Sequence, residues 1–334
     1  MKKYLWAISY GLALTAFTAY IALDTFVISH KMQTDATKMN TSMFDSVSQA
    51  DITADNGENT EAAIEGADSD TAAVGTFEGG NEYLLSSGYT PLEIKQQADY
   101  KDENISITLS EFFENDTHIY VADVYLTSAQ YLKTAFAEDT YGRNITAYTS
   151  EIAEEHGAVF AVNGDYYGAQ ESGYVIRNGI AYRSGQTAND VLCIYATGDL
   201  AVISSAEKTT DQLIGEGVWQ AFSFGPAIVL DSKVSVTKDQ EVGKAMSSNP
   251  RTAIGQLGPL HYIFVVSDGR TSESEGLTLY QLGKFMQKLG AVTAYNLDGG
   301  GSSSMYFMGE VINQPTSSGR SIKERGVSDI VYIS

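Results

Sequence analysis

An uncharged apolar run near the N-terminus separates the first part of this chain from any globular fold. Lys2 and Lys3 precede residues 4–23, which hold no charged side chain. About 20 mainly apolar residues cross the core of a bilayer as a helix, whereas the apolar core of a cleaved signal peptide has only about 7–15 residues. A strict Ala-X-Ala cleavage signal is also missing from residues 1–30. We therefore predict a membrane anchor over residues 1–30 rather than a cleaved signal.

The two lysines predict the topology of this anchor. Basic residues beside a membrane span favour the cytoplasmic side. We expect a single-pass protein of the cell membrane whose C-terminal domain is extracytoplasmic.

The segment after the anchor is acidic and poor in large apolar residues. Residues 33–80 contain ten acidic residues and one lysine, a net charge of −9. Such a segment cannot bury enough apolar surface to offset the entropy of ordering it. We therefore expect residues 31–80 to be a disordered acidic linker. A calcium-binding tract is the alternative, but these acids lack the ligand spacing of an EF-hand.

The remaining residues, 81–334, are long enough for one globular domain. They hold 31 acidic and 17 basic residues, a net charge of −14. This charge argues against a nucleic-acid partner, whose binding site is usually a basic patch. The only cysteine of the chain, Cys193, excludes an intramolecular disulfide framework, and the four histidines show no metal-ligand spacing. No G-x-S-x-G motif suggests a serine hydrolase.

Short apolar runs bounded by turn residues predict a strand-rich domain. We expect strands at residues 105–113, 118–127, 158–162, 174–176, 180–182, 191–195, 200–203, 251–256, 261–267, 291–297, 304–307 and 327–333, and an apolar segment at 221–230 that contains the Phe224-Gly225-Pro226 break. Two helices are expected, at residues 149–156 and 277–289. The predicted class is α+β: a strand-rich, mixed-sheet catalytic domain over residues 81–334, behind a transmembrane helix and the acidic linker.

The loop after the strand at 291–297 is the strongest candidate for a binding site. It reads Asn296-Leu297-Asp298-Gly299-Gly300-Gly301-Ser302. The glycines let a ligand approach backbone N–H groups, which can form an anion-binding nest, and Ser302 adds a hydroxyl. A tight hairpin with a capping aspartate is the structural alternative, although it needs fewer glycines.

Three further loops combine charge with glycine or aromatic residues. Asn163-Gly164-Asp165-Tyr166-Tyr167-Gly168 suits a sugar, because rings pack on its apolar face and polar groups bind its hydroxyls. Arg251, and Arg325 in the pair Glu324-Arg325, are candidate clamps for a phosphate or carboxylate. Asp268-Gly269-Arg270 follows another strand. Ordinary turns and surface charge pairs are the alternatives for these loops.

The order of these motifs resembles the phosphodiester glycosidase family over about residues 95–334. The motifs are Asn163-Gly164-Asp165-Tyr166-Tyr167-Gly168, Phe224-Gly225-Pro226-Ala227, Pro250-Arg251-Thr252-Ala253-Ile254-Gly255, Asp268-Gly269-Arg270, Asn296-Leu297-Asp298-Gly299-Gly300-Gly301-Ser302 and Glu324-Arg325. The resemblance implies cleavage between the anomeric carbon of a sugar and a phosphodiester oxygen. The anchor and the absence of disulfides look similar to bacterial members, which are often grouped with exopolysaccharide or cell-envelope proteins.

Glycosidic cleavage of this kind typically uses two carboxylates. The candidates are Asp298 and Glu324, with Asp165 third. Candidate substrate-binding residues are Asn163, Tyr166, Tyr167, Arg251, Asp268, Arg270, Gly299, Gly300, Gly301, Ser302 and Arg325. No cofactor is predicted with certainty; a divalent cation that bridges Asp165 or Asp298 to the phosphate stays open.

The expected partners are therefore a phosphoglycan or sugar-phosphodiester substrate and, through the N-terminal helix, a membrane. Two other functions compete with a glycosidase. One is a metal-dependent phosphodiesterase that cuts the P–O bond rather than the C–O bond. The other is a non-catalytic protein that binds envelope glycans.

Overall fold

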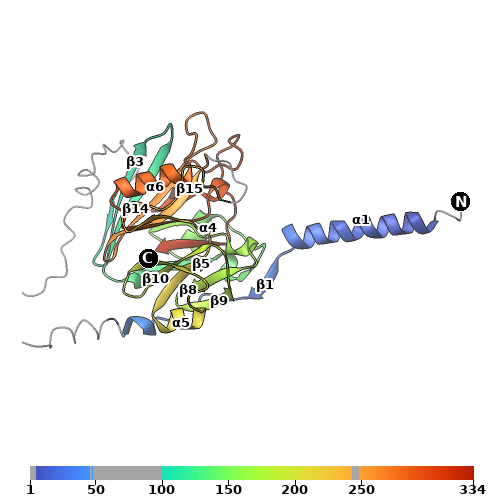
Figure 1. Ribbon diagram of the computed structural model, residues 1–334, viewed down its shortest axis with the longest axis horizontal. Helices are drawn as coiled ribbons and strands as arrows, with labels where there is room; N and C mark the ends of the chain where they lie inside the picture. The colour runs from blue at the N-terminus through green and yellow to red at the C-terminus, as the bar shows by residue number, and fades with distance from the viewer. Residues whose placement is uncertain (1–4, 46, 48–98, 243–247) are drawn as a thin grey trace, which may run out of the picture.

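The structure, a computed structural model, describes residues 5–45, 47, 99–242 and 248–334. Its domain is built from antiparallel sheets with a few short helices (Figure 1). The largest sheet has eight strands in the order β14-β13-β17-β15-β16-β4-β3-β2. Their bounds are β2 (Asp99–Lys101), β3 (Ile105–Phe113), β4 (His118–Leu126), β13 (Ala227–Leu230), β14 (Lys233–Val234), β15 (Arg251–Gly258), β16 (His261–Ser267) and β17 (Thr293–Asn296).

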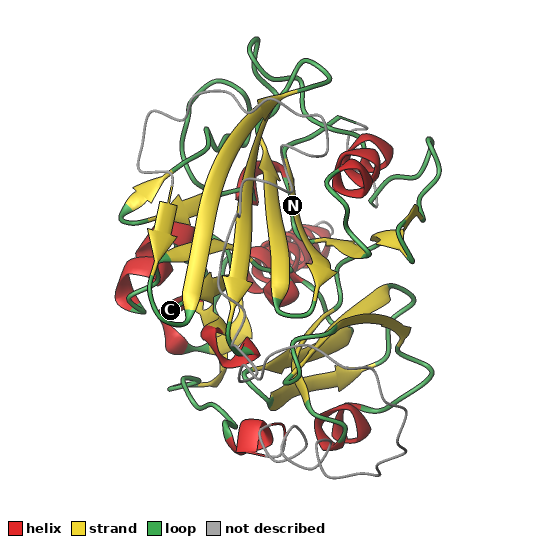
Figure 2. Ribbon diagram, turned by 90° about the vertical axis from the view of Figure 1, so that its left-hand side faces the viewer, coloured by secondary structure: helices red, strands yellow, loops and turns green. Residues whose placement is uncertain are grey.

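Two five-stranded sheets complete the domain (Figure 2). One has the order β19-β18-β7-β20-β5, with β5 (Leu132–Phe136), β7 (Phe160–Asn163), β18 (Met305–Phe307), β19 (Glu310–Val311) and β20 (Asp329–Ile333). The other has the order β11-β10-β12-β8-β9, with β8 (Gly173–Arg177), β9 (Ile180–Gly185), β10 (Asp190–Tyr195), β11 (Leu200–Ser204) and β12 (Val218–Phe222).

The main hydrophobic core lies between these sheets. Phe264 of β16 and Phe160 of β7 meet there with ring centroids 5.0 Å apart, and both side chains are fully buried. Phe222 of β12 belongs to the same core. The core therefore fixes the ends of β7, β15 and β17, where the candidate loops begin.

Three helices cover the outer faces of the sheets. They are α4 (Thr149–Glu155), α5 (Thr210–Gly215) and α6 (Leu279–Lys288). The apolar face of α6 packs on the eight-stranded sheet. Thr278 caps its first turn, accepting a hydrogen bond from the backbone N–H of Gln281. Gly283 lets α6 approach β13 closely, since a Cβ there would lie 2.9 Å from the carbonyl oxygen of Ile228.

The sequence pattern predicted most of these elements, and the strand-rich α+β class is confirmed. Strand β3 has the predicted bounds, and α6 is shorter than predicted by two residues at one end and one at the other. The predicted segment at 221–230 forms two strands, β12 and β13, on either side of the expected Phe224-Gly225-Pro226 break. Strand β5 was not predicted. The pairings between the described strands are antiparallel rather than mixed in direction.

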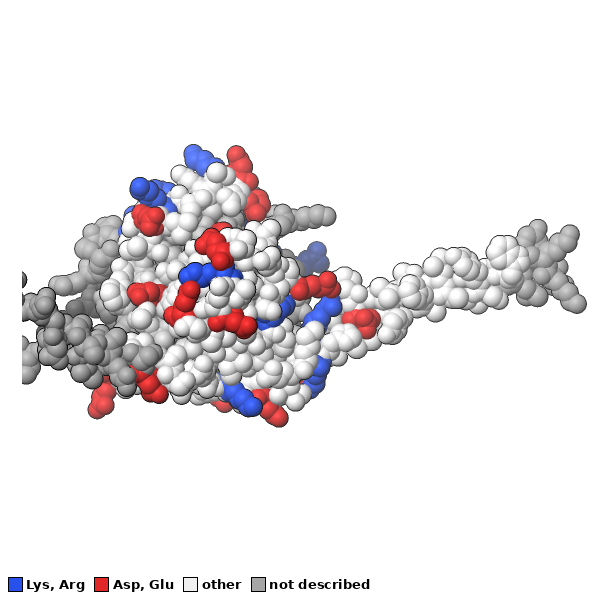
Figure 3. Space-filling model, turned by 60° about the horizontal axis from the view of Figure 1, so that its bottom comes forward, with Lys and Arg blue, Asp and Glu red and all other residues white. Residues whose placement is uncertain are grey.

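The N-terminal segment begins as a long apolar helix, α1 (Leu5–Phe26). It is the one helix in the described residues that is long and apolar enough to cross a membrane. Figure 3 shows no acidic or basic side chains along most of its length.

The chain after α1 is ordered where a disordered linker was expected. Strand β1 (His30–Gln33) pairs with β6 (Tyr141–Arg143), and Ala36 is buried. Residues 30–33 and Ala36, within or next to the expected linker, therefore contact the domain. The rest of the expected linker, residue 46 and residues 48–80, lies outside the described residues, as do residues 81–98 of the expected domain.

The close approach of α6 to β13 predicts an unusual effect of alanine. Alanine favours a helix interior over glycine by about 1 kcal/mol, yet Gly283→Ala should lower the free energy of unfolding because its methyl group would contact the Ile228 carbonyl. Gly215→Ala in α5 is the matched control, because no atom lies within 4 Å of its added Cβ. Thermal unfolding of both variants checks this prediction. A Gly283→Ala protein as stable as Gly215→Ala would contradict it.

Candidate functional site

A buried asparagine joins the two strongest candidate loops. The Asn163 Nδ2 atom, at the end of β7, donates to the Asp298 carbonyl oxygen at 2.6 Å. Its Oδ1 atom accepts from Thr252 Oγ1 at 2.8 Å and from the Ser304 backbone N–H at 3.3 Å. The backbone N–H of Asp298 donates to the Gly164 carbonyl oxygen at 3.2 Å. Asn163 thus holds the loops after β7 and β17 together, rather than presenting its side chain to a ligand.

Asp298 lies at the base of the glycine loop, close to the surface. Its residue is 8% exposed, and its Oδ1 atom accepts from the backbone N–H of Gly299 at 2.9 Å. Burial raises the pKa of Asp298 above the ordinary value, although the Ser302 hydroxyl and Arg325 oppose this. A carboxyl with a raised pKa next to a cation is typical of a functional site.

Arg325 connects Asp298 with the solvent. Its Nη2 atom lies 3.3 Å from Asp298 Oδ2 and 2.6 Å from Ser302 Oγ. The guanidinium also lies 5.9 Å from the ring centroid of Tyr166. Arg325 keeps 42% of its side chain exposed, and Tyr166 is 38% exposed. A cation, an aromatic ring and a carboxylate therefore meet at one accessible place.

Arg270 approaches the glycine loop from another side. A Cβ on Gly300 would lie 2.9 Å from the Arg270 Nη2 atom, and Gly300 has a φ of 62°. The guanidinium donates to Asn249 Oδ1 and to the Ser317 carbonyl oxygen. Burial lowers the pKa of Arg270, and the positive charge of Arg325 lowers it further. Two cations, Arg270 and Arg325, therefore lie beside the glycine loop.

The glycines of this loop are also required by packing. A Cβ on Gly299 would lie 2.8 Å from the Pro250 carbonyl oxygen, and one on Gly301 would overlap Ser317. Gly300–Ser302 forms a short 3₁₀ helix rather than a tight hairpin. The three glycines thus bring the loop against its neighbours and leave no side chain between the two arginines.

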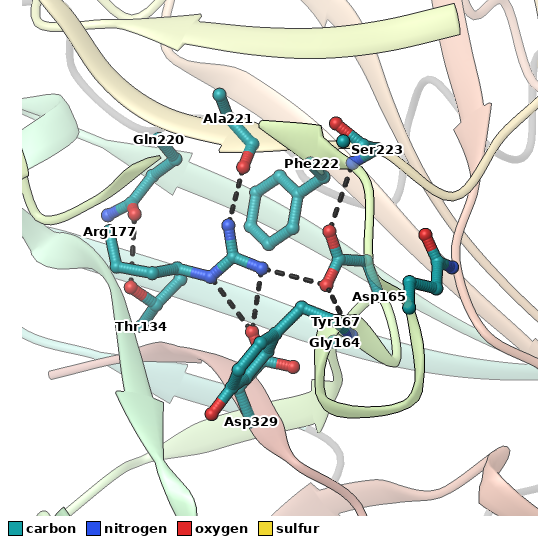
Figure 4. Close-up of polar contacts among 12 residues, drawn as sticks. Thr134, Gly164, Asp165, Tyr167, Arg177, Gln220, Ala221, Phe222, Ser223 and Asp329 are labelled. Atoms are coloured by element: carbon teal, nitrogen blue, oxygen red, sulfur yellow. Dashed lines mark hydrogen bonds and ion pairs between the residues drawn. The ribbon is translucent and has the colours of Figure 1, made fainter. Parts of the chain in front are cut away.

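Asp165 takes part in a buried ion cluster (Figure 4). Its Oδ1 atom accepts from Arg177 Nη2 at 2.8 Å, and its Oδ2 atom accepts from the Ser223 backbone N–H at 3.0 Å. Arg177 also bonds Asp329 Oδ2 through Nε at 2.8 Å, and its guanidinium lies 4.2 Å from the Phe222 ring centroid. Both oxygens of Asp165 are therefore engaged by protein donors.

The cluster contains one cation and two carboxyl groups, all nearly inaccessible to water. Burial, together with the charge of Asp165, raises the pKa of Asp329 to about 7 against the effect of Arg177. Gly164 packs on this carboxyl, since a Cβ there would overlap Asp329. With both carboxyl groups ionised, the cluster has a net charge of −1, and binding of one proton makes it neutral.

The remaining predicted residues fall outside the contacts of Asp298. Glu324 bonds the Ser150 hydroxyl and backbone N–H at the start of α4, whereas the next side chain, Arg325, contacts Asp298. Arg251 is buried and donates through Nε to the Leu277 carbonyl oxygen at 2.9 Å. Burial lowers the pKa of Arg251 to about 10.

Asp268 and Tyr167 are also buried. Asp268 accepts from the Gln314 backbone N–H at 2.8 Å and from Asn313 Nδ2 at 3.2 Å. Tyr167 stacks on Tyr141 with centroids 5.2 Å apart. These two side chains therefore contact other protein groups in the walls of the site.

The described residues contain no group of three or more His, Cys, Asp and Glu side chains placed to hold a metal ion. Asp165, one of the two carboxylates considered for a bridging cation, has both oxygens occupied by protein donors.

Sequence reasoning missed Arg177 and Asp329. Arg177 lies between the strands predicted at 174–176 and 180–182, and Asp329 lies within the strand predicted at 327–333. The available signal was a single charged residue at one end of each otherwise uncharged strand, which implies a buried partner.

Comparison with known proteins gives the same family as the motifs. A model of the phosphodiester glycosidase family matches residues 156–334, more than half of the chain. The chain is 30% identical over 189 residues to the SPbeta prophage-derived uncharacterized protein YomE of Bacillus subtilis (strain 168), a match covering 55% of this chain and 29% of that protein. It is 26% identical over 185 residues to the mouse (Mus musculus) N-acetylglucosamine-1-phosphodiester alpha-N-acetylglucosaminidase, covering 51% and 36%. The chain thus spans about a third of the length of these relatives.

The fold has a counterpart among solved structures. The zebrafish N-acetylglucosamine-1-phosphodiester alpha-N-acetylglucosaminidase catalytic domain aligns with a TM-score of 0.55 and 19% identity. The alignment covers 72% of this chain and 85% of that one. The two chains share a fold.

The buried cluster predicts how stability depends on pH. Because folding raises the pKa of Asp329, its favourable contribution is complete below the ordinary value of 3.8 and is lost as the pH rises through about 7. In the Asp329→Asn variant, the side-chain amide that replaces the carboxyl group does not titrate. The stability of the wild type should therefore fall relative to Asp329→Asn between pH 4 and pH 7, by up to about 1.4 kcal/mol per pH unit.

Thermal unfolding of the detergent-solubilised proteins at several pH values measures this difference. The exposed Asp239→Asn variant is the control and should follow the wild type at each pH. Parallel curves for the wild type and Asp329→Asn would show that Asp329 keeps its ordinary titration in the folded protein.

Proposed function

The chain belongs to the phosphodiester glycosidase family, and from this premise we propose that it hydrolyses a sugar-1-phosphodiester. The bond cleaved is the one between the anomeric carbon and the phosphodiester oxygen. The products are a free sugar and a phosphate monoester.

The observation that supports this proposal most directly is the contact between Asp298 and Arg325. A carboxylate and a guanidinium lie 3.3 Å apart beside a loop without side chains, at the surface of a domain with a net charge of −14. An acidic domain needs local cations to hold an anionic substrate. Arg325 and Arg270 supply them, and the backbone of the glycine loop lies between.

The same geometry suggests where each part of the substrate binds. The phosphodiester accepts hydrogen bonds from Arg325 and lies near Arg270, which places the sugar over Tyr166 with its anomeric carbon toward Asp298. Aromatic rings pack well on the apolar face of a sugar. Of the three predicted catalytic carboxylates, Asp298 alone contacts this accessible place.

Asp298 would act in its ionised form, as a nucleophile at the anomeric carbon or as a base for water. A phosphate leaves readily, so little proton donation to the leaving oxygen is needed, and the cations stabilise its charge. This accounts for a site in which a second carboxylate, Glu324, is turned toward α4. The anomeric configuration of the released sugar distinguishes the two roles.

We also propose that α1 anchors the protein in the cell membrane as a single pass, with the domain on the extracytoplasmic side. The support is one apolar helix preceded by two lysines. The substrate class is then a phosphoglycan of the cell envelope or an exopolysaccharide.

Product analysis tests the reaction. Wild-type protein incubated with an N-acetylglucosamine-1-phosphodiester should release reducing sugar and a phosphate monoester. Asp298→Asn should lower kcat by ~10²–10⁴-fold, and the wild-type kcat/KM should fall on acidification at a pH above 3.8, because burial raises the pKa of Asp298. Release of sugar 1-phosphate would support the metal-dependent phosphodiesterase instead. Binding without turnover would support the glycan-binding protein.

A second variant tests the role of the exposed cation. Arg325→Gln should lower kcat/KM by ~10–100-fold, since a charge-assisted hydrogen bond contributes ~1.5–3 kcal/mol. Arg320→Gln, an exposed arginine of the same loop, is the matched control and should change kcat/KM little. Equal activity of the two variants would remove Arg325 from the site.

A further inference from the structure

A cavity beside the candidate site is bordered by the end of the apolar helix. Its volume is about 370 Å³, and its lining includes Tyr166 and Arg325 from the site. Phe26 and Val27, which end and follow α1, line the same cavity. The helix predicted to cross the membrane and the cation predicted to bind the phosphate therefore face one common space.

The end of α1 is held in this place by the domain. Asn144 Nδ2 donates to the carbonyl oxygens of Thr25 at 3.1 Å and Ile28 at 3.0 Å. The Ser29 hydroxyl donates to the Asn144 carbonyl oxygen at 3.0 Å. The chain then continues as β1, paired with β6 (Figure 1). The position of the cavity relative to α1 is thus part of the fold.

The charges at the end of α1 indicate the level of the bilayer at which the cavity lies. The first charged group after the apolar run is Asp24, whose Oδ1 atom lies 3.3 Å from His30 Nε2. This pair marks where the hydrocarbon core of a bilayer must end. Phe26 follows within one helical turn, about 5.4 Å. The headgroup layer beyond the core is also only about 5–7 Å thick on each side.

Apolar side chains at this level are exposed on the cavity side of the domain. Phe26 is 78% exposed and Val27 is 64% exposed. In a bilayer such side chains lie at the boundary between acyl chains and headgroups. Arg325, on the same cavity, then lies at the depth of lipid phosphates, where it can reach a phosphodiester that stays in the membrane.

We propose that the substrate is a sugar-1-phosphodiester of a membrane lipid, cleaved in the same bilayer that holds α1; this inference rests on the proposed function. The sugar binds over Tyr166 and Asp298, the phosphate binds Arg325, and the lipid chain leaves the cavity past Phe26 and Val27. The C–O bond at the anomeric carbon breaks, and its electron pair stays with the phosphate oxygen. Water supplies the hydroxyl of the sugar and releases one proton, while the lipid phosphate remains in the membrane.

Confinement to the bilayer favours such a substrate over a soluble one. A lipid substrate in the membrane that holds α1 is kept near the cavity, which raises its effective concentration.

Reconstituted full-length protein tests this inference. Phosphatidylcholine vesicles carry the protein together with N-acetylglucosaminyl phosphopolyprenol, and a parallel sample receives the soluble N-acetylglucosaminyl phosphomethyl ester at equal total concentration. We expect release of N-acetylglucosamine from the lipid at least about tenfold faster than from the soluble ester. Lipid substrate placed in separate vesicles should not be cleaved.

Variants at the lip of the cavity give the second measurement. The double variant Phe26→Ser, Val27→Ser should raise KM for the lipid substrate about tenfold and leave kcat/KM for the soluble ester unchanged. Met308→Ser, an exposed apolar residue outside the cavity lining, is the control and should change neither. Flotation with the vesicles and a melting curve show that each variant inserts and folds. Phe26→Leu, which keeps an apolar side chain, should have the wild-type KM for the lipid substrate.

The outcomes separate this inference from the function on which it rests. If the soluble ester is hydrolysed and the lipid is not, or if the two are hydrolysed equally, the proposed function stands and the membrane substrate is wrong. An equal effect of the double variant on both substrates also overturns the membrane substrate. If folded, inserted protein hydrolyses neither, the proposed function fails and this inference fails with it.

Discussion

A guanidinium buried between two carboxyl groups organises the part of the molecule on which the candidate site is built. Arg177 bonds Asp165, 12 residues away in the chain, and Asp329, 152 residues away. A buried ion of this kind is tolerated only when its partners are fixed, because an unpaired charge in the interior costs several kcal/mol. The cluster therefore fixes the loop after β7 against β8 and β20. Asn163 in turn holds the loop that carries Asp298, through its hydrogen bond to the Asp298 carbonyl oxygen.

This arrangement divides the carboxyl groups into two kinds. Asp165 and Asp329 each bond the buried Arg177, and Asp268 accepts from backbone and amide donors inside the protein. Asp298 keeps contact with the exposed Arg325. The negative charge of the domain therefore does not prevent an anion from binding, because two arginines, Arg325 and Arg270, lie beside the glycine loop.

Much of the fold could be predicted from the sequence, because apolar periodicity and turn residues are local signals. The motifs and their order along the chain also indicated the family. The roles of individual residues could not be predicted in this way, since they depend on contacts between distant segments. Glu324 and Arg325 are neighbours in the chain, yet one contacts Ser150 and the other Asp298. The order of residues 30–36 comes from pairing with β6 rather than from their composition.

We propose that the site around Asp298 and Arg325 breaks a C–O bond, and the fate of an oxygen isotope tests this reaction most directly. A sugar-1-phosphodiester is hydrolysed by the wild-type protein in water enriched in oxygen-18, and both products are examined by mass spectrometry. Cleavage at the anomeric carbon places the label in the sugar and leaves the phosphate monoester unlabelled. Label in the phosphate would show attack at phosphorus and would contradict this account of the site.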